Sequence, residues 1–460
     1  MESGSIFESC LWDELSDRPV VDRHQILPAD VDVVIVGAGF TGLWTAFYLS
    51  RMDAALRIAV VERSHIGFGA SGRNGGWCSS LLPMSLDSMK DRHGFAQTVA
   101  MQQAMFESVE EIERQTKLLG IDCDFARGGS IELLRSPSQV DRAEKHLSKL
   151  RSFGFGEDRY RILNRDETRN IVEARRTVGG FFDSTSAVLH PKKLVDGLAR
   201  VVRSLGVSIF ENVEVLSISK GSVITSGGEI TCRSVLRTTE AFTSRLAGAR
   251  RELIPLYSMM IATEPLSNDL WDAIGLSNRT SFNDGRNMII YGQRTLDGRL
   301  AFGGRGAPYH FGSKIDPKFD FDQKVAANLR RTLLEIFPIL HNTSFTHHWG
   351  GPLGAPRDWT CSVAYDRATG LGSAGGYVGD GVTTSNLAGR TLARLVTNER
   401  DGLTQLPWVD HQSRKWEPEP VRWIAVNALT RLAGWADWYE AKTGRPSKLV
   451  NAMIVKITSG

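Results

Sequence analysis

The sequence predicts an α/β protein in which one domain is built from separated segments and a second domain is inserted into it. Residues 31–36 form a β-branched run that ends in glycine, residues 41–51 follow with a helical pattern, and residues 57–61 form a second buried run. This succession has the size of a βαβ unit. Residues 370–382 predict a glycine-rich strand and turn near the other end of the chain. Strand-rich sequence separates these two parts, and we therefore expect an insertion.

The remaining elements follow from the spacing of the apolar residues. A helical period predicts helices at residues 95–119, 138–153, 192–205, 323–337 and 383–396. Alternation predicts strands at residues 124–134, 207–219, 253–264, 287–292 and 299–304, with a hairpin near Gly227 and Gly228.

Composition excludes several classes of protein. The apolar fraction is 42% and the charged fraction 23%, which is ordinary for a soluble globular protein, and a net charge of +3 does not suggest a partner made of nucleic acid. The five cysteines are scattered and form no CxxC pair, so we expect a reducing compartment and neither a disulfide framework nor a zinc site. The N-terminus does not resemble a signal peptide, and no run of about 18 apolar residues occurs. We expect a cytoplasmic enzyme.

A dinucleotide-binding motif opens the first helix. Gly37, Gly39 and Gly42 match G-x-G-x-x-G between a predicted strand and a predicted helix. The first glycine permits the tight turn, the second lets a pyrophosphate approach the backbone, and the third lets helix and strand pack closely. Glu62 ends the next strand, where an acidic residue is expected to meet the ribose hydroxyls. The motif therefore predicts a bound dinucleotide on a Rossmann-like domain.

A second match to the same motif, at residues 370–375, is a decoy. It is followed by more glycines, and Leu395 stands where the acidic residue is wanted. We interpret this segment as a strand that passes close to a cofactor, so a separate NAD(P)H site is unsupported.

A loop rich in small residues, 63–76, follows Glu62 directly. Small residues let the main chain lie against a flat ligand, and Ser71, Arg73 and Asn74 add hydrogen-bond donors for phosphate or ring carbonyls.

Four motifs together resemble those of the D-amino-acid oxidase superfamily of FAD enzymes. They are VIVGAGFTGL, VVER, GASGRNGG and, near the C-terminus, GGYVGDGV. Within that superfamily the chain is similar to the gamma-glutamylputrescine oxidase and glycine/sarcosine oxidase group, over residues 30–396. The resemblance implies FAD as the cofactor. It implies FAD contacts for Gly37, Gly39, Phe40, Thr41, Gly42, Glu62, Arg63, Ala70, Ser71, Arg73, Asn74, Gly75, Val213, Gly379, Asp380, Gly381 and Val382.

The resemblance also gives the separated segments an expected function. We assign residues 28–92, 190–250 and 355–400 to an FAD-binding domain. Residues 93–189 and 251–354 form the inserted substrate domain, based on a mostly antiparallel sheet, and residues 401–460 form a C-terminal helical tail.

The residue at position 380 and the residues around Cys361 differ from those of some members of the family. Relatives commonly carry histidine where this chain has Asp380, and a carboxylate beside reduced, anionic flavin is unfavourable. Asp380 therefore either points away and accepts hydrogen bonds from its own turn, which we favour slightly, or faces the pocket and binds a cationic amine. Some sarcosine oxidases hold FAD through cysteine, but the surroundings of Cys361 do not match, so we expect non-covalent FAD.

The expected reaction is oxidation of a C–N bond of an amine or amino acid, with hydride transfer to flavin, hydrolysis of the imine product and dioxygen as acceptor. The alternative is a dehydrogenase that uses a quinone or protein acceptor, and a flavin monooxygenase is a weaker rival. Candidate catalytic residues are Tyr257, Tyr291, Arg305, Trp349 and Asp380, and Arg305 could clamp a carboxylate or pair with a structural acid. We expect no metal, because adjacent His347 and His348 would point to opposite faces of a strand.

The tail carries an amphipathic helix in which Val421, Ile424, Ala428, Leu432 and Trp435 recur at helical spacing. We expect this face to pack on the body of the protein or on a second subunit, which would allow a homodimer. The alternative is attachment to a membrane surface, with Lys442, Arg445 and Lys448 near lipid headgroups. We favour packing and expect no firm membrane association.

Overall fold

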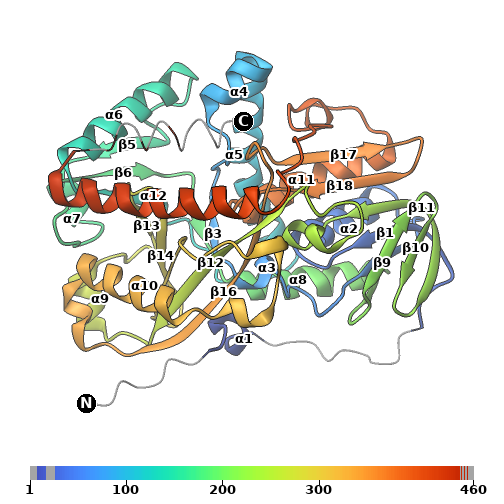
Figure 1. Ribbon diagram of the computed structural model, residues 1–460, viewed down its shortest axis with the longest axis horizontal. Coiled ribbons are helices and arrows are strands. Elements are labelled where there is room, and N and C mark those ends of the chain that lie inside the picture. The colour runs from blue at the N-terminus through green and yellow to red at the C-terminus, as the bar shows by residue number, and fades with distance from the viewer. Residues whose placement is uncertain (1–7, 17–25, 446, 448–449, 451–452, 454–460) are drawn as a thin grey trace.

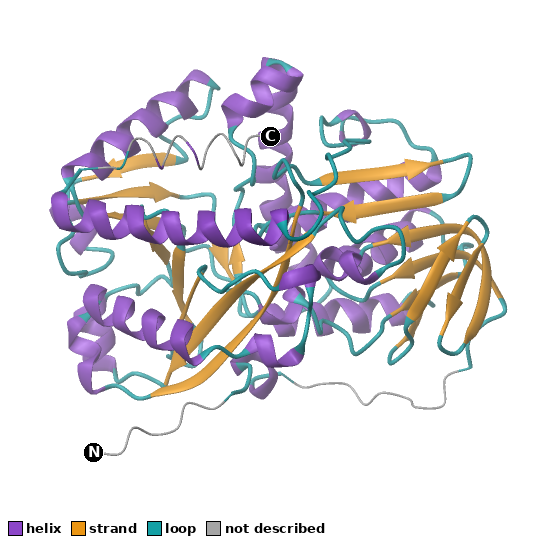
Figure 2. Ribbon diagram, viewed as in Figure 1, coloured by secondary structure: helices purple, strands orange, loops and turns teal. Residues whose placement is uncertain are grey.

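The computed structural model describes residues 8–16, 26–445, 447, 450 and 453, and it contains two large sheets (Figures 1 and 2). The first of these sheets is mainly parallel. Its strand order is β17-β18-β11-β1-β2-β8, and all pairings from β18 to β8 are parallel. The strands are β1 (Asp30–Val36), β2 (Ile58–Val61), β8 (Ser208–Phe210), β11 (Gly228–Arg237), β17 (Ser362–Asp366) and β18 (Leu371–Gly375). A hairpin of β9 (Val215–Ser219) and β10 (Ser222–Thr225) pairs with β11. These strands come from widely separated segments, as predicted.

Helices cover this sheet and share one apolar core. They are α2 (Phe40–Met52), α4 (Leu86–His93), α5 (Phe95–Leu118), α8 (Pro191–Ser204) and α11 (Gly381–Thr397). The short helix α3 (Ala70–Arg73) contacts α8. The main core cluster contains Leu43 of α2, Met105 of α5 and Leu387 of α11, all fully buried. The predicted domain boundaries stay predictions, but α5, which they assign to the inserted domain, packs in the core of the first sheet.

The second sheet confirms the prediction of a mostly antiparallel arrangement, with the order β16-β12-β15-β14-β13-β4-β6-β5. Only the β13–β4 pairing is parallel. Its strands are β4 (Ser130–Leu134), β5 (Tyr160–Leu163), β6 (Gly179–Asp183), β12 (Ile254–Thr263), β13 (Ser281–Asp284), β14 (Ile290–Arg294), β15 (Leu300–Gly304) and β16 (Phe345–Ala355). Around it lie α6 (Pro137–Ser152), α7 (Arg165–Arg169), α9 (Asn268–Ile274) and α10 (Gln323–Ile336).

Smaller elements join the two sheets. Strands β3 (Trp77–Cys78) and β7 (Ala187–Val188) form a short ladder, and a 3-10 helix η1 (Glu240–Arg245) follows β11. A further 3-10 helix, η3 (Pro317–Asp320), precedes α10. Helix α1 (Leu11–Glu14) was not predicted: its Trp12 indole donates a hydrogen bond of 2.8 Å to the carbonyl of Asn74.

Candidate active site

A large cavity of about 680 Å³ opens at the carboxyl ends of β1 and β2 and extends to β16 of the second sheet. Its walls are the β1–α2 turn, the end of β2, residues 68–74, residues 212–215, residues 238–246, residues 314–320 and the start of α11. A site outside the carboxyl ends of parallel strands is the usual position for ligands in such sheets. The volume lies in the range of cofactor and small-molecule pockets.

The glycine motif shapes the first wall. Gly37 adopts a φ of +108°, a left-handed conformation that favours glycine at the end of β1. Gly39 is the N-cap of α2, and no side chain of its own occupies the helix N-terminus there. Gly42 lies outside the cavity, and a Cβ at this position would collide with the carbonyl oxygen of Gly37. The third glycine therefore serves close packing of helix and strand.

Glu62 lies at one end of the cavity with both carboxylate oxygens engaged. Oε2 accepts the N–H of Ala38 and Oε1 accepts the N–H of Ser64, each at 2.9 Å. Burial raises the pKa of Glu62, and these two N–H donors oppose the rise. The N–H of Val213 donates to the carbonyl of Glu62 at 2.9 Å, so the predicted adenosine-binding residues lie together. Arg63 forms an ion pair of 3.1 Å with Glu214 at the same end.

The loop of small residues lines the middle of the cavity. The Ser71 hydroxyl accepts the N–H of Phe40 at 2.9 Å, which ties this loop to the start of α2. Arg73 donates to Asp320 of η3 at 2.5 Å and stacks over the Phe68 ring at 4.5 Å. Asp320 was not identified from the sequence. Its pairing with Arg73 holds residues 314–320, another unpredicted wall, against the cavity.

The start of α11 forms the opposite wall, where Gly379, Gly381 and Val382 line the cavity. The predicted hydrogen bonds of the Asp380 side chain to its own turn are wrong, because this side chain caps no N–H of α11. Asp380 instead lies in the field of Arg305, whose guanidinium donates to the carbonyl of Val378 at 2.6 Å. Arg305 thus bonds a backbone carbonyl and does not line the cavity, and both alternatives for it, a carboxylate clamp and pairing with a structural acid, stay predictions.

Glu240 is a site residue that the sequence analysis missed. It lines the cavity, and its carboxylate accepts the N–H groups of Gly354 at 2.6 Å and of Gly376 and Tyr377 at 2.9 Å each. Burial raises the pKa of Glu240, and the N–H donors oppose the rise. The carboxylate thereby fastens the end of β16 to the turn before α11. No local motif marks it, since its partners lie more than 100 residues away.

The predicted catalytic residues surround the cavity without lining it. Trp349 is buried and donates from its indole to the carbonyl of Arg73 at 2.9 Å. The Tyr291 hydroxyl bonds Ser258 at 2.9 Å, and its ring leaves no room for a Cβ at Gly75. Tyr257 is buried edge-on to the rings of His310 and Phe319. Their catalytic roles stay predictions.

His347 and His348 each have a polar partner outside the cavity. His347 contacts Glu14 at 2.9 Å, and His348 accepts the N–H of Asp322 at 2.9 Å. Among the residues that the structure describes, no group of three or more metal-ligating side chains occurs.

The cavity walls fit FAD. The N-termini of two long helices, α2 and α11, open on one cavity, and neither N-cap residue supplies a side-chain cap. Ser71 accepts the first N–H of α2, and the dipole of each helix leaves its N-terminus positively polarised for anionic parts of a ligand. Cavity-lining residues from the predicted cofactor set are Gly37, Gly39, Phe40, Thr41, Glu62, Arg63, Ala70, Ser71, Arg73, Asn74, Val213, Gly379, Gly381 and Val382. Gly42, Gly75 and Asp380 from that set do not line the cavity. The contact of each residue with FAD remains a prediction.

Comparison with known proteins decides the family, because the family model described as FAD dependent oxidoreductase (DAO) matches residues 32–395. The chain belongs to this family. It is an FAD-dependent oxidoreductase, which confirms the predicted cofactor and the predicted resemblance.

Individual members of the DAO family align over most of the chain. Gamma-glutamylputrescine oxidoreductase of Escherichia coli is 29% identical over 82% of this chain and 86% of its own. Probable oxidoreductase OrdL of Haemophilus influenzae is 27% identical over 81% of this chain and 84% of its own. The crystal structure of glycine oxidase from Geobacillus kaustophilus matches with a TM-score of 0.70 and 21% identity, over 84% of this chain and all of that one. This structural likeness shows the shared fold.

Cys361 bears on how this DAO-family chain holds FAD. Its thiol is buried outside the cavity walls, and burial raises its pKa to about 12, so little thiolate forms near neutral pH. We expect acid or heat precipitation to release all of the flavin into the supernatant as FAD and not as FMN. Chromatography of the supernatant measures this. A peptide containing Cys361 with a flavin-sized increase in mass would contradict the prediction.

Proposed function

We propose that the protein oxidises a C–N bond of an amine or amino acid. The observation that carries the proposal is the extent of the cavity, which runs from the two helix N-termini to Pro352 and Leu353 of β16. A small molecule seated there would lie between the FAD site and the second sheet. Several similar proteins support the class of substrate, since they are named for oxidation of an amine or amino acid.

The protein residues in this proposal bind, orient and exclude water. When bound, FAD would supply the redox chemistry, as the acceptor of a hydride from the substrate carbon next to the nitrogen. The N-terminus of α2 would hold the pyrophosphate and Glu62 the adenosine ribose. The Arg73–Asp320 pair holds residues 314–320 over the cavity and so limits the access of water.

An anaerobic substrate screen tests the proposed function. The FAD-loaded protein is mixed with single amines and amino acids, including N-methylated, cyclic and polyamine-derived compounds, and the flavin absorbance is followed. We expect at least one compound to bleach the flavin and to yield a carbonyl product with release of ammonia or an amine. If none of these compounds bleaches the flavin while dithionite does, the proposal is wrong.

Dioxygen is the proposed electron acceptor, and a quinone or protein acceptor is the alternative. Stopped-flow mixing of the reduced protein with dioxygen separates them, because an oxidase reoxidises within the time of turnover and a dehydrogenase does not.

The monooxygenase alternative requires that NADPH bleach the flavin. We expect no bleaching, because the glycine segment at residues 370–375 forms strand β18 and not the turn of a strand-turn-helix motif.

Asp380→Asn tests the electrostatic role of Asp380. Burial raises the pKa of Asp380 from 3.8 to about 6, and Arg305 opposes the rise. Because the folded-state pKa lies above the unfolded value, the contribution of Asp380 to stability falls as the pH rises from about 4 to about 6 and then levels off. We expect the thermal midpoint of the variant, relative to wild type, to rise over that interval.

The same variant should have a higher flavin reduction potential at neutral pH, because a negative charge beside the α11 turn is removed. Its substrate KM should stay within about threefold of wild type, since Asp380 does not line the cavity. A tenfold rise in KM for cationic amines would instead assign Asp380 to substrate binding. Unchanged potential, KM and pH profile would make it a bystander.

A further inference from the structure

Helix α12 (Val421–Thr443) turns an apolar face to solvent. The predicted face of Val421, Ile424, Ala428, Leu432 and Trp435 is exposed, so its predicted packing on the body of the protein is wrong. Packing of this face on a second subunit stays a prediction. Trp438, with 57% exposure, belongs to the same face. We call Val421, Ile424, Leu432, Trp435 and Trp438, together with the cations Arg431 and Lys442, the outer face of α12.

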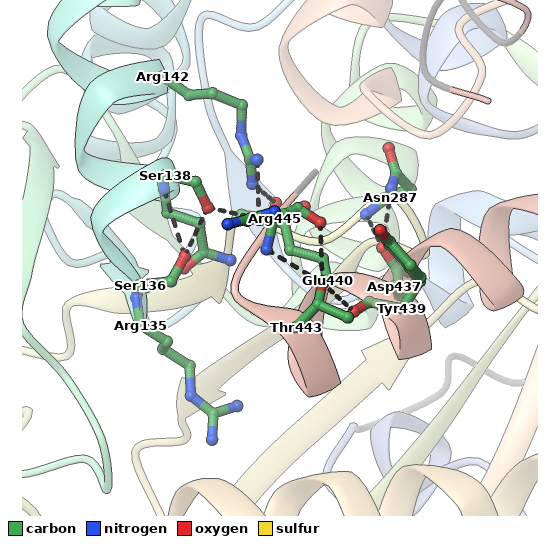
Figure 3. A network of polar contacts seen from close by, with 12 residues as sticks. Arg135, Ser136, Ser138, Arg142, Asn287, Asp437, Tyr439, Glu440, Thr443 and Arg445 are labelled. Atoms are coloured by element: carbon green, nitrogen blue, oxygen red, sulfur yellow. Dashed lines mark hydrogen bonds and ion pairs between the residues drawn. The ribbon is translucent and has the colours of Figure 1, made fainter. Parts of the chain in front are cut away.

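The inward side of α12 is polar, and Figure 3 shows the network that holds it. The Asp437 carboxylate accepts the N–H groups of Asn287 and Met288, each at 2.7 Å. The Glu440 carboxylate accepts Arg142 at 2.8 Å and the Ser138 hydroxyl at 3.1 Å. These contacts join α12 to α6 and to the β13–β14 connection. The helix therefore docks through hydrogen bonds and ion pairs.

The rest of the inward side carries small and polar residues and Val426, which packs against the core cluster that contains Tyr309. Asn427 donates to the carbonyl of Tyr309 at 3.0 Å, and Arg422 pairs with Glu419 at 3.0 Å. The apolar residues of α12 that are fully covered are only Ala433 and Ala436. Large apolar side chains of a surface helix normally face the core, so the exposed tryptophans and aliphatic residues of α12 indicate an interaction surface on its outer side.

The charges on α12 are divided in the same way. Its two carboxylates, Asp437 and Glu440, are both engaged on the inward side. Arg431 and Lys442 are exposed, and Arg445 follows the helix, also exposed. The Lys442 ammonium lies 5.1 Å from the centre of the Trp438 ring. The outer face thus combines tryptophan, aliphatic residues and cations without an acidic residue of the helix.

We propose that the outer face of α12 binds the surface of a lipid bilayer that contains anionic phospholipid. Tryptophan favours the interface between headgroups and acyl chains, and cations on an interfacial helix are attracted to anionic lipid. The helix lies in the interface plane and does not cross the bilayer. In the described part of the chain, no helix is long and apolar enough to span a membrane.

A second copy of the chain fits this face less well. Arg431 lies near the middle of α12, so a two-fold pairing of outer faces would bring two Arg431 side chains together with no carboxylate of either helix between them. Desolvating like charges opposes such a contact. Anionic headgroups supply the negative charge that a second α12 lacks. Lys448, which the sequence placed near headgroups, lies outside the described residues.

Vesicle flotation tests the proposal with the full-length, FAD-loaded protein. We expect the protein to float with vesicles of phosphatidylcholine containing about one-third phosphatidylglycerol, and to bind pure phosphatidylcholine at least tenfold more weakly. High salt should release it from the anionic vesicles. The double variants Trp435→Ser/Trp438→Ser and Arg431→Glu/Lys442→Glu should each lower the partition coefficient at least tenfold.

Matched controls replace residues of the same kind elsewhere. Leu216→Ser/Ile224→Ser removes two exposed apolar side chains of the β9–β10 hairpin, and Arg51→Glu/Lys220→Glu reverses two exposed cations. Both controls should partition as wild type does. Flavin content and thermal midpoints, measured for every variant, establish that the proteins are folded.

Two results would overturn the proposal. One is a wild-type protein that does not float with the anionic vesicles, or that floats equally well after both outer-face changes. The other is a dimer in lipid-free solution that dissociates on Trp435→Ser/Trp438→Ser, as measured by sedimentation velocity, because this outcome assigns the outer face to a second copy.

Discussion

Gly39→Val is expected to yield folded protein that is colourless. Gly39 has a φ of −86°, which valine tolerates, so the backbone of the β1–α2 turn can persist. A Cβ at this position would lie 2.8 Å from the Ser71 hydroxyl, and the valine methyl groups would crowd the N-terminus of α2 where the pyrophosphate is expected. We expect FAD affinity to fall at least tenfold, which is about 1.4 kcal/mol.

The FAD-to-protein ratio from visible absorbance measures this loss. Gly402→Val is the matched control, because no atom beyond its chain neighbours lies within 4 Å of a Cβ built at Gly402 and that glycine does not line the cavity. The control should retain its full flavin content. A Gly39→Val protein that also keeps its full flavin content would show that the β1–α2 turn does not hold FAD.

Glu240→Ala is expected to destabilise the protein and to weaken FAD binding. The change removes the acceptor of three backbone N–H groups, those of Gly354, Gly376 and Tyr377. Leaving a buried donor unsatisfied costs about 1–3 kcal/mol. The variant leaves three such donors unsatisfied, but it also removes the free-energy cost of burying the Glu240 carboxylate. We therefore expect the free energy of unfolding to fall by about 3 kcal/mol.

Denaturant unfolding of the apoprotein measures the loss, and titration with FAD measures the second effect. Glu264→Ala is the matched control, because Glu264 accepts a single N–H, that of Ser344, at an exposed site. It should cost less than about 1 kcal/mol. If Glu240→Ala costs no more than this control, the carboxylate does not fasten β16 to the α11 turn.

The local chemistry of the cofactor site was predictable from the sequence. The glycine spacing, the strands on either side of α2 and the acid at Glu62 all belong to one short segment, and a phosphate-binding turn depends on backbone conformation that neighbouring residues determine. The alternating patterns of residues 253–264, 287–292 and 299–304 likewise predicted the strands β12, β14 and β15. Of the predicted cofactor residues, all except Gly42, Gly75 and Asp380 line the cavity.

Residues that act across long separations could not be found in this way. Glu240 bonds groups at positions 354, 376 and 377, and the Asp320 carboxylate meets Arg73 from a segment 247 residues away. Arg305, which directly follows β15, likewise donates a hydrogen bond to the carbonyl of Val378. Each pairing depends on how the second sheet packs against the first, and local periodicity carries no information about that packing.

Helix α12 shows the same division within one element. Its apolar stripe follows from residue spacing, because a helix places residues three and four apart on one face. Which side of the helix faces the protein depends on the hydrogen-bond donors and acceptors of the neighbouring surface. Here the N–H groups of Asn287 and Met288 and the guanidinium of Arg142 require acceptors, and Asp437 and Glu440 supply them. The polar side of the helix is therefore held against the protein, and its tryptophans are left facing outward.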